Sequence, residues 1–254
     1  MQNTVLVTGS SAGIGEEFAW QLARLGYNLL LVARRTDKLS ALQKAITLKF
    51  PRQKCLTLAL DLNEESATQS INNFVDLQQI ELVGLINNAG FGARGAFAEL
   101  SEDRQRDMVQ VNILCLTRLT HAFIPYLKKQ KNTFIINVAS TAAFQAGPNL
   151  AIYYASKAFV LSFSEALHEE LKGQIQVSAL CPGATKTEFA QIAGMSDSLV
   201  FKMRVMEKQA VVSFALKNRH KAIAIPGLIN KIGVIIVKLL PRSITRKLAF
   251  QIQK

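Results

Sequence analysis

Residues 4–15 read Thr4-Val-Leu-Val-Thr-Gly-Ser-Ser-Ala-Gly-Ile-Gly15, a strand-like run that leads directly into a glycine-rich turn. The run is short, apolar and rich in valine, as expected for a strand that is buried on both faces. A helical pattern begins within the turn, at Gly13. Glycines here let the backbone approach a pyrophosphate closely, and the helix N-terminus offers unpaired N–H groups to it.

The spacing of the three glycines is G-x-x-x-G-x-G, which differs from the G-x-G-x-x-G fingerprint of many dinucleotide sites. Glycines in a sharp turn can also have a purely steric role. The position of this turn, directly after the first predicted strand, favours a site for the phosphates of a dinucleotide.

Strand-like and helical patterns alternate along the rest of the chain. Runs rich in Val, Ile and Leu predict strands at residues 4–7, 29–32, 55–60, 82–86, 134–138, 175–180 and 222–225. Helical patterns lie between them at residues 13–25, 37–50, 64–77, 102–128 and 152–172. The alternation predicts an α/β fold, a Rossmann-like doubly wound parallel sheet of about seven strands with helices on both faces and a C-terminal helical extension.

The composition fits a single domain of 254 residues, about half of them apolar. We expect a dinucleotide-binding and catalytic core over residues 1–190, and a lid, the last strand and basic helices over residues 191–254. Neither a secretory signal nor a run of about 18 uncharged apolar residues is present, which favours a cytoplasmic protein. The scattered cysteines and histidines lack metal-ligand spacing, so we expect no metal.

Two arginines, Arg34 and Arg35, follow the second predicted strand. An NAD site of this architecture places an acidic residue here, where it binds the ribose 2′-hydroxyl. Arginines suit a 2′-phosphate instead. We therefore expect NADP(H) rather than NAD(H); the alternative is that both arginines are simply solvated surface residues.

Six motifs, in order, resemble those of the short-chain dehydrogenase/reductase family. The glycine motif matches residues 8–15, N-N-A-G matches residues 87–90, and the P-G turn matches residues 182–183, with Thr185 and Thr187 after it. The catalytic positions of the family match Asn112, Ser140, Tyr153 and Lys157, the last two as Y-x-x-x-K. The matches extend from residue 4 to about residue 190.

The spacing of Tyr153 and Lys157 places both side chains on one face of a helix. A nearby ammonium would lower the pKa of the phenol, so that Tyr153 could act as a general acid or base. The resemblance implies that Lys157 also holds the nicotinamide ribose, that Ser140 binds the substrate oxygen, and that Asn112 holds a relay water. Alternatively, Ser140 is a turn residue and Asn112 a satisfied core amide.

The resemblance also implies which residues contact the cofactor. Asp61 and Leu62 would lie on the adenine side, although Asp61 could instead cap a helix. Residues 88–90 would form the floor, and residues 182–187 would close over the nicotinamide. The full set is Gly9, Ser11, Gly13, Ile14, Gly15, Arg34, Arg35, Asp61, Leu62, Asn88, Ala89, Gly90, Tyr153, Lys157, Pro182, Gly183, Thr185 and Thr187.

These observations predict an NADP(H)-dependent oxidoreductase that acts on a carbonyl or a secondary alcohol. The segment after Gly183 would form a lid and favours an apolar substrate, unless its apolar residues merely pack on the core. The residues concerned are Phe189, Ile192, Met195, Leu199, Phe201 and Met203. A non-catalytic nucleotide sensor is the less favoured alternative, and the resemblance implies a homo-oligomer, a dimer or tetramer.

The net charge of +12 is concentrated at the C-terminal end, where residues 202–254 hold twelve Lys and Arg against the single acid Glu207. Two amphipathic patterns, at 226–240 and 243–253, combine apolar residues with lysine and arginine. They suit an anionic membrane surface or an acidic partner such as an acyl carrier. The alternative function is therefore a lipid or ketoacyl reductase that these basic helices recruit to a membrane surface. The alternative is that they pack on the core or in a dimer, with their lysines in solvent. Without a recognition motif, nucleic acid is disfavoured.

Overall fold

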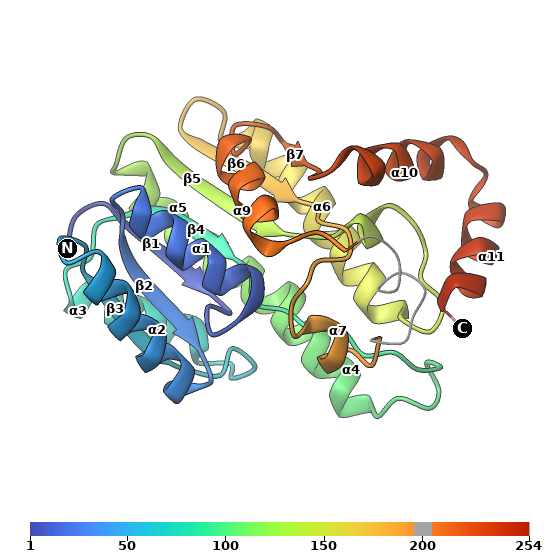
Figure 1. Ribbon diagram of the computed structural model, residues 1–254, viewed down its shortest axis with the longest axis horizontal. Helices are drawn as coiled ribbons and strands as arrows, with labels where there is room; N and C mark the ends of the chain where they lie inside the picture. The colour runs from blue at the N-terminus through green and yellow to red at the C-terminus, as the bar shows by residue number, and fades with distance from the viewer. Residues whose placement is uncertain (196–204, 254) are drawn as a thin grey trace.

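The computed structural model describes the backbone of residues 1–195 and 205–253, and within these ranges its centre is one parallel sheet. The strand order is β3-β2-β1-β4-β5-β6-β7 (Figure 1). The strands are β1 (Thr4–Thr8), β2 (Asn28–Ala33), β3 (Cys55–Ala59), β4 (Leu82–Asn87), β5 (Thr133–Val138), β6 (Ile175–Leu180) and β7 (Ile223–Ala224). The predicted doubly wound sheet is confirmed, and its order reverses between β1 and β4, where such folds bind ligands.

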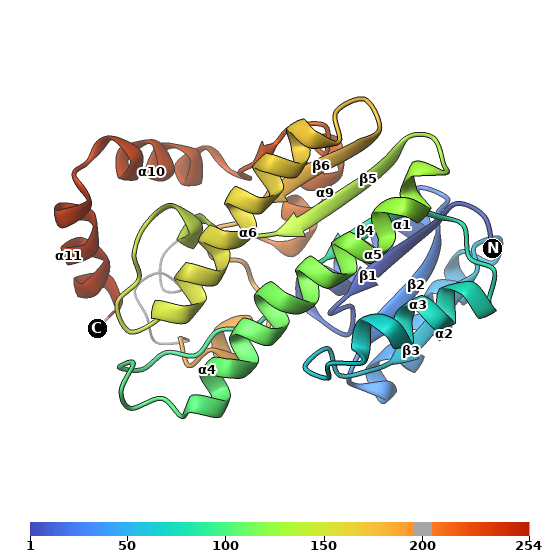
Figure 2. The same ribbon diagram turned by 180° about the vertical axis from the view of Figure 1, so that it is seen from behind.

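Helices cover both faces of the sheet (Figures 1 and 2). One face carries α1 (Gly13–Arg24), α2 (Thr36–Lys49) and α9 (Lys208–Lys217). The other carries α3 (Ala67–Leu77), α5 (Leu116–Lys128) and α6 (Ala151–Glu170). The remaining described α-helices are α4 (Glu102–Val109), α7 (Phe189–Ile192), α10 (Leu228–Leu239) and α11 (Arg242–Gln253).

The central strand β1 contributes to two hydrophobic cores, because side chains alternate between the faces of a strand. Val5 and Val7 pack in one core with Phe18 of α1. Leu6 packs in the other with Phe123 of α5. All of these side chains are fully buried, which explains why the strand is continuously apolar.

The helix predicted over residues 102–128 is not continuous. A π-helical segment, Gln110–Cys115, joins α4 to α5 and contains Asn112. In this wider turn the Asn112 side chain reaches the loop after β4, where the N–H of Phe91 donates to Oδ1 (3.1 Å) and Nδ2 donates to the oxygen of Phe91 (3.0 Å). Short π-helical segments of this kind occur frequently at functional sites.

The C-terminal helices α10 and α11 extend beyond the sheet, at the end of the molecule opposite the N-terminus (Figures 1 and 2). Before them, β7 pairs with β6, and α9 packs its Val211 and Val212 into the same core as α1. None of the helices in the described ranges is both long and apolar enough to cross a bilayer.

Candidate active site

A cavity of about 530 Å³ lies at the carboxyl ends of the central strands. It is lined by the loops that follow β1, β4, β5 and β6, by the start of α6, and by one side of α10. Most of the residues that the sequence predicts to be catalytic or to bind the cofactor line this cavity. They are Gly9, Ser11, Gly13, Ile14, Arg35, Asn88, Ala89, Gly90, Ser140, Tyr153, Lys157, Pro182, Gly183, Thr185 and Thr187.

A set of hydrogen bonds joins the loops after β1 and β4. Thr8 Oγ1 accepts from the backbone N–H groups of Asn88 (3.0 Å) and Ala89 (3.1 Å). In return, Asn88 Nδ2 donates to the backbone oxygens of Thr8 and Gly9, both at 3.0 Å. The T-G and N-N-A-G motifs are therefore two halves of one clamp that fixes the glycine turn.

The glycine turn has no space for larger residues. A Cβ atom on Gly15 would lie 2.3 Å from the oxygen of Gly9, and Gly13 adopts a positive φ of 60° where α1 begins. The residue before the helix, Ala12, makes no side-chain cap. The first N–H groups of α1 thus lack a side-chain acceptor, as an anion site at a helix N-terminus requires. Gly15 itself shapes the turn without lining the cavity.

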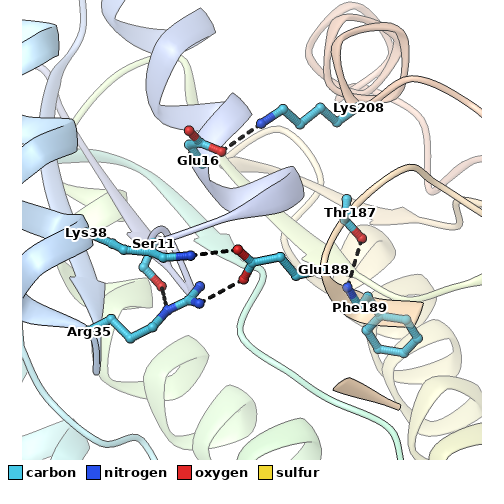
Figure 3. A network of polar contacts seen from close by, with 8 residues as sticks. All are labelled: Ser11, Glu16, Arg35, Lys38, Thr187, Glu188, Phe189 and Lys208. Carbon is cyan, nitrogen blue, oxygen red and sulfur yellow. Dashed lines mark hydrogen bonds and ion pairs between the residues drawn. The ribbon is translucent and has the colours of Figure 1, made fainter. Parts of the chain in front are cut away.

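The two predicted arginines have different environments. Arg35 lines the cavity, where Nε donates to Ser11 Oγ (3.2 Å) and Nη1 pairs with Glu188 (2.8 Å). Lys38 also pairs with Glu188, at 2.6 Å, as Figure 3 shows. These two cations hold the pKa of Glu188 below its usual range, with Lys38 as the larger cause. Arg34 points elsewhere: its side chain is 71% exposed and lies 3.7 Å from Asp61.

The adenine-side residues Asp61 and Leu62 do not line the cavity. Asp61 Oδ1 accepts from the N–H of Asn63 (3.0 Å), and the helix cap after it is Ser66. Asp61 is therefore a turn residue and not the helix cap that the sequence allowed. Leu62 is buried in the core beneath α3.

Ser140, Tyr153 and Lys157 lie together on one wall of the cavity. Ser140 follows β5 and caps the 3₁₀ helix Thr141–Phe144, and its hydroxyl donates to the oxygen of Pro182 at 3.4 Å. The Lys157 ammonium lies 5.9 Å from the centre of the Tyr153 ring, and it donates to the oxygen of Val138 at 2.7 Å. Ser140 is therefore both a turn residue, as one alternative expected, and a residue that lines the cavity.

Burial controls the ionisation of this wall. It raises the pKa of the Tyr153 phenol above its ordinary value, and the hydrogen bond from Ser140 offsets only part of the increase. It lowers the pKa of Lys157 to about 8. The net shift of the phenol pKa is upward in this structure because loss of solvation dominates, and the Lys157 ammonium is directed at a backbone oxygen. Stabilisation of the phenolate by Lys157 stays a prediction.

Asn112 is the one predicted catalytic residue that does not line the cavity. Its side chain is buried, and besides its bonds to Phe91 it donates to Ser156 Oγ at 3.1 Å. A Cβ atom on Gly90 would lie 2.9 Å from Asn112 Oδ1 and 3.5 Å from Lys157 Nζ. Asn112 is thus a satisfied core amide that lies directly behind the cavity wall.

The segment after β6 closes over the cavity. A Cβ atom on Gly13 would lie 3.1 Å from Thr187, and Thr185 bridges to Met206. Phe189 of α7 lies 5.4 Å from Tyr153, ring centre to ring centre. The predicted lid residues Phe189, Ile192 and Met195 line the cavity, and so does Tyr154. The predicted lid residues Leu199, Phe201 and Met203 are outside the described residues.

Sequence reasoning missed the contribution of α10. Its residues Ile229, Asn230, Gly233, Val234 and Val237 form part of the cavity wall. Asn230 packs against the P-G turn, since a Cβ on Gly183 would lie 2.4 Å from its Oδ1. The only local signal was an asparagine in a helix that is apolar apart from Lys231 and Lys238, and the packing partner of the asparagine lies 47 positions away.

Comparison with known proteins agrees with this geometry. The family described as short chain dehydrogenase matches residues 3–197. The very-long-chain 3-oxoacyl-CoA reductase of Aspergillus niger is 37% identical over 171 residues, which are 66% of this chain and 49% of that protein. This chain therefore spans about half the length of the curated relatives that it matches.

Solved structures cover nearly the whole chain. A short-chain dehydrogenase from Sphingobium yanoikuyae in complex with NADPH is 30% identical, has a TM-score of 0.81, and covers 94% of this chain and 97% of its own. A short-chain dehydrogenase/reductase from Burkholderia phymatum in complex with NAD shares the fold, with a TM-score of 0.81, 21% identity and 92% coverage of each chain. The chain belongs to the short-chain dehydrogenase/reductase family of NAD(P)-dependent oxidoreductases.

Proposed function

We propose that this chain reduces a carbonyl group to a secondary alcohol with NADP(H), and that Tyr153 is the general acid. The observation that carries the proposal is the placement of Ser140, Tyr153 and Lys157 in one cavity with the glycine turn. Oxidation of the alcohol would use the same residues in reverse. When bound, the nicotinamide supplies the hydride, while the protein supplies position and polarity.

The hydroxyls of Ser140 and Tyr153 would hold the carbonyl oxygen of the substrate. Two O–H donors aimed at this oxygen stabilise the negative charge that develops on it. Tyr153 then gives its proton to the oxygen, and the Lys157 ammonium stabilises the phenolate that remains. Burial favours the protonated phenol, which is the form that reduction requires. Asn112 would position the wall from behind.

The glycine turn and Arg35 fit an NADP(H) cofactor. The uncapped start of α1 suits the diphosphate, and Ser11 and Arg35 lie beside it with the cation of Lys38. A 2′-phosphate would be an acceptor for the guanidinium of Arg35. Glu188 pairs with the same two cations, so the preference for NADP(H) depends on how easily the 2′-phosphate replaces this carboxylate as their partner.

The cavity wall favours an apolar substrate with a long chain. Beside the catalytic wall it is formed by aromatic and aliphatic side chains of the lid and α10. The names of the curated relatives, very-long-chain 3-oxoacyl-CoA reductases, point to a 3-oxoacyl compound. We propose an acyl-chain ketone of this class as the substrate.

The same proposal covers location and assembly. The basic C-terminal end favours a peripheral enzyme at the cytoplasmic surface of a membrane. By family resemblance we expect it to work as a homodimer or homotetramer.

Replacement of Tyr153 by Phe tests the mechanism. Tyr153→Phe removes the proton donor but keeps the ring that packs on Phe189, so turnover should fall at least about a hundredfold. NADPH binding, measured by fluorescence, should change less than about threefold. Near-normal reduction of a panel of short, acyl-chain and steroid ketones by the variant would rule out this role.

The pH dependence of reduction tests Lys157. With a pKa of about 8, Lys157 is charged below pH 8 and neutral above it, so kcat/KM should fall as the pH rises through this value. Lys157→Arg keeps its charge across this range and should remove the break, even if its rate is lower. A break near pH 8 that persists in the variant would assign it to another group.

The two arginines allow a matched test of cofactor choice. Arg35→Ala should weaken NADPH binding by about tenfold or more and leave NADH binding nearly unchanged, because only NADPH has the 2′-phosphate. Arg34→Ala, at an exposed position outside the cavity, should have a much smaller effect. Equal loss of both cofactors on replacing both arginines, measured by titration calorimetry, would contradict the 2′-phosphate site.

Glu188 offers the opposite test. Glu188→Gln removes the carboxylate that competes for Arg35 and Lys38, so NADPH should bind about two- to fivefold more tightly relative to NADH. Glu16→Gln is the control, since Glu16 pairs with Lys208 at 2.7 Å on the other side of the turn (Figure 3). The control should leave the ratio of the two affinities unchanged. A lower NADPH preference in Glu188→Gln would show that Glu188 supports the site.

A further inference from the structure

Helix α10 has its apolar side turned to solvent. At 100° per residue, the stripe that faces away from the cavity contains Leu228, Ile232, Ile235 and Leu239. These side chains are between 47% and 79% exposed. We define the C-terminal apolar surface as these residues together with four further exposed apolar residues of the two helices, Ile229, Ile236, Ile244 and Leu248.

The basic residues of α10 lie beside this surface and not at its centre. Lys231 Nζ lies 5.3 Å from the ring centre of Phe214, and Lys238 Nζ lies 5.1 Å from that of Phe144. Both lysines are nevertheless exposed, as the alternative expected, whereas the stripe of Leu228, Ile232, Ile235 and Leu239 does not pack on the core. Packing of this stripe in a dimer stays an alternative for the test below. A helix with this pattern leaves its outer side for another apolar phase.

The charge around the surface selects its partner. Residues 208–254 contain ten Lys and Arg and no Asp or Glu. In the two helices, Arg242, Arg246 and Lys247 are exposed beside the apolar residues. Self-association through this surface would bring basic residues against basic residues without an acidic partner. An anionic lipid surface satisfies both the charge and the apolar area.

The length of α10 determines how it would bind. Its 12 residues span about 18 Å, which is well short of the roughly 30 Å hydrocarbon core of a bilayer. It can therefore lie along the membrane surface with its apolar stripe among the acyl chains and its basic residues at the headgroups.

The same helix separates the cavity from this surface. Val234 and Val237 face the cavity, on the side opposite Leu228 and Leu239. Ile229 belongs both to the cavity wall and to the C-terminal apolar surface, because it lines the cavity and is 65% exposed. The rim of the cavity on this side is thus apolar and continuous with the C-terminal apolar surface.

We propose that α10 and α11 dock on an anionic membrane, and that the cavity opens beside Ile229 toward the lipid. The substrate would then be a water-insoluble carbonyl compound that enters from the membrane. Docking stands on the surface alone, whereas the entrance rests on the proposed function.

Docking is tested with the whole protein and vesicles of equal parts phosphatidylcholine and phosphatidylglycerol. The protein should co-sediment with them, less at high salt, and not with pure phosphatidylcholine. The double change Ile235→Asn and Ile236→Asn, which leaves the cavity wall intact, should weaken binding by at least about tenfold. The control pair Leu48→Asn and Leu77→Asn, at positions 86% and 78% exposed on α2 and α3, should bind normally.

Absence of binding at low salt would overturn the proposal, as would equal binding by both variants. The wild type could fail to bind vesicles and elute as a dimer in size-exclusion chromatography, while the α10 variant alone elutes as a monomer. In that case the surface is an interface between copies of this chain. The α10 variant could still bind vesicles while a variant with Arg242, Arg246 and Lys247 neutralised does not. This outcome would assign vesicle binding to charge alone and reject the apolar contact.

The entrance is tested with two ketones, one long-chain ketone held in the vesicles and one short ketone in water. The α10 variant should lose most of its activity on the first and keep its activity on the second. Equal activity ratios in wild type and variant would overturn the lipid entrance. Vesicle binding without reduction of any ketone would leave docking in place and refute the proposed function together with the entrance.

Discussion

The site depends on the hydrogen bonds between Thr8 and Asn88, which join the loops after β1 and β4. These two strands are paired neighbours in the sheet, and the hydrogen bonds between Thr8 and Asn88 extend their connection beyond the last paired residues, Val7 and Ile86, into the two loops. The Thr8 hydroxyl and the Asn88 carboxamide hold the glycine turn against Ala89. Gly15 can then approach the oxygen of Gly9 more closely than any side chain would allow, and the start of α1 faces the cavity.

The other wall is governed by loss of solvation. Burial penalises charge on both Tyr153 and Lys157, so it raises the pKa of the first and lowers that of the second. Burial therefore favours the protonated form of the Tyr153 phenol and makes the Lys157 ammonium easier to deprotonate near neutral pH. A wall of this kind suits the proposed transfer of a proton from the phenol to a substrate oxygen, with Lys157 as the proposed source of the replacement proton, while the hydride would come from the bound nicotinamide.

Local motifs predicted much of this molecule, and tertiary contacts explain what they missed. Most strands were predictable because they are short apolar runs buried on both faces. The shared place of Ser140, Tyr153 and Lys157 in the cavity was predictable because each follows a strand or lies within one helix turn. The π-helical segment at Asn112 was not predictable, since the partner of the Asn112 side chain is Phe91, which lies 21 residues away and leaves no local pattern. The pairing of Glu188 with Arg35 spans 153 positions and leaves no local pattern.

Helix α10 shows why its orientation could not be inferred from its sequence. Hydrophobic periodicity identifies a stripe but not the side on which water lies. One polar contact distinguishes the inner side of α10: Asn230 fits against Gly183, where no Cβ is present, and donates to the oxygen of Pro226 at 2.8 Å. Val234, four residues further along on the same side, is buried, whereas Ile235 is exposed. The inner wall of the cavity and the apolar surface are therefore opposite sides of the same helix, and the inner side is marked by a contact with Gly183, which lies far away in the sequence.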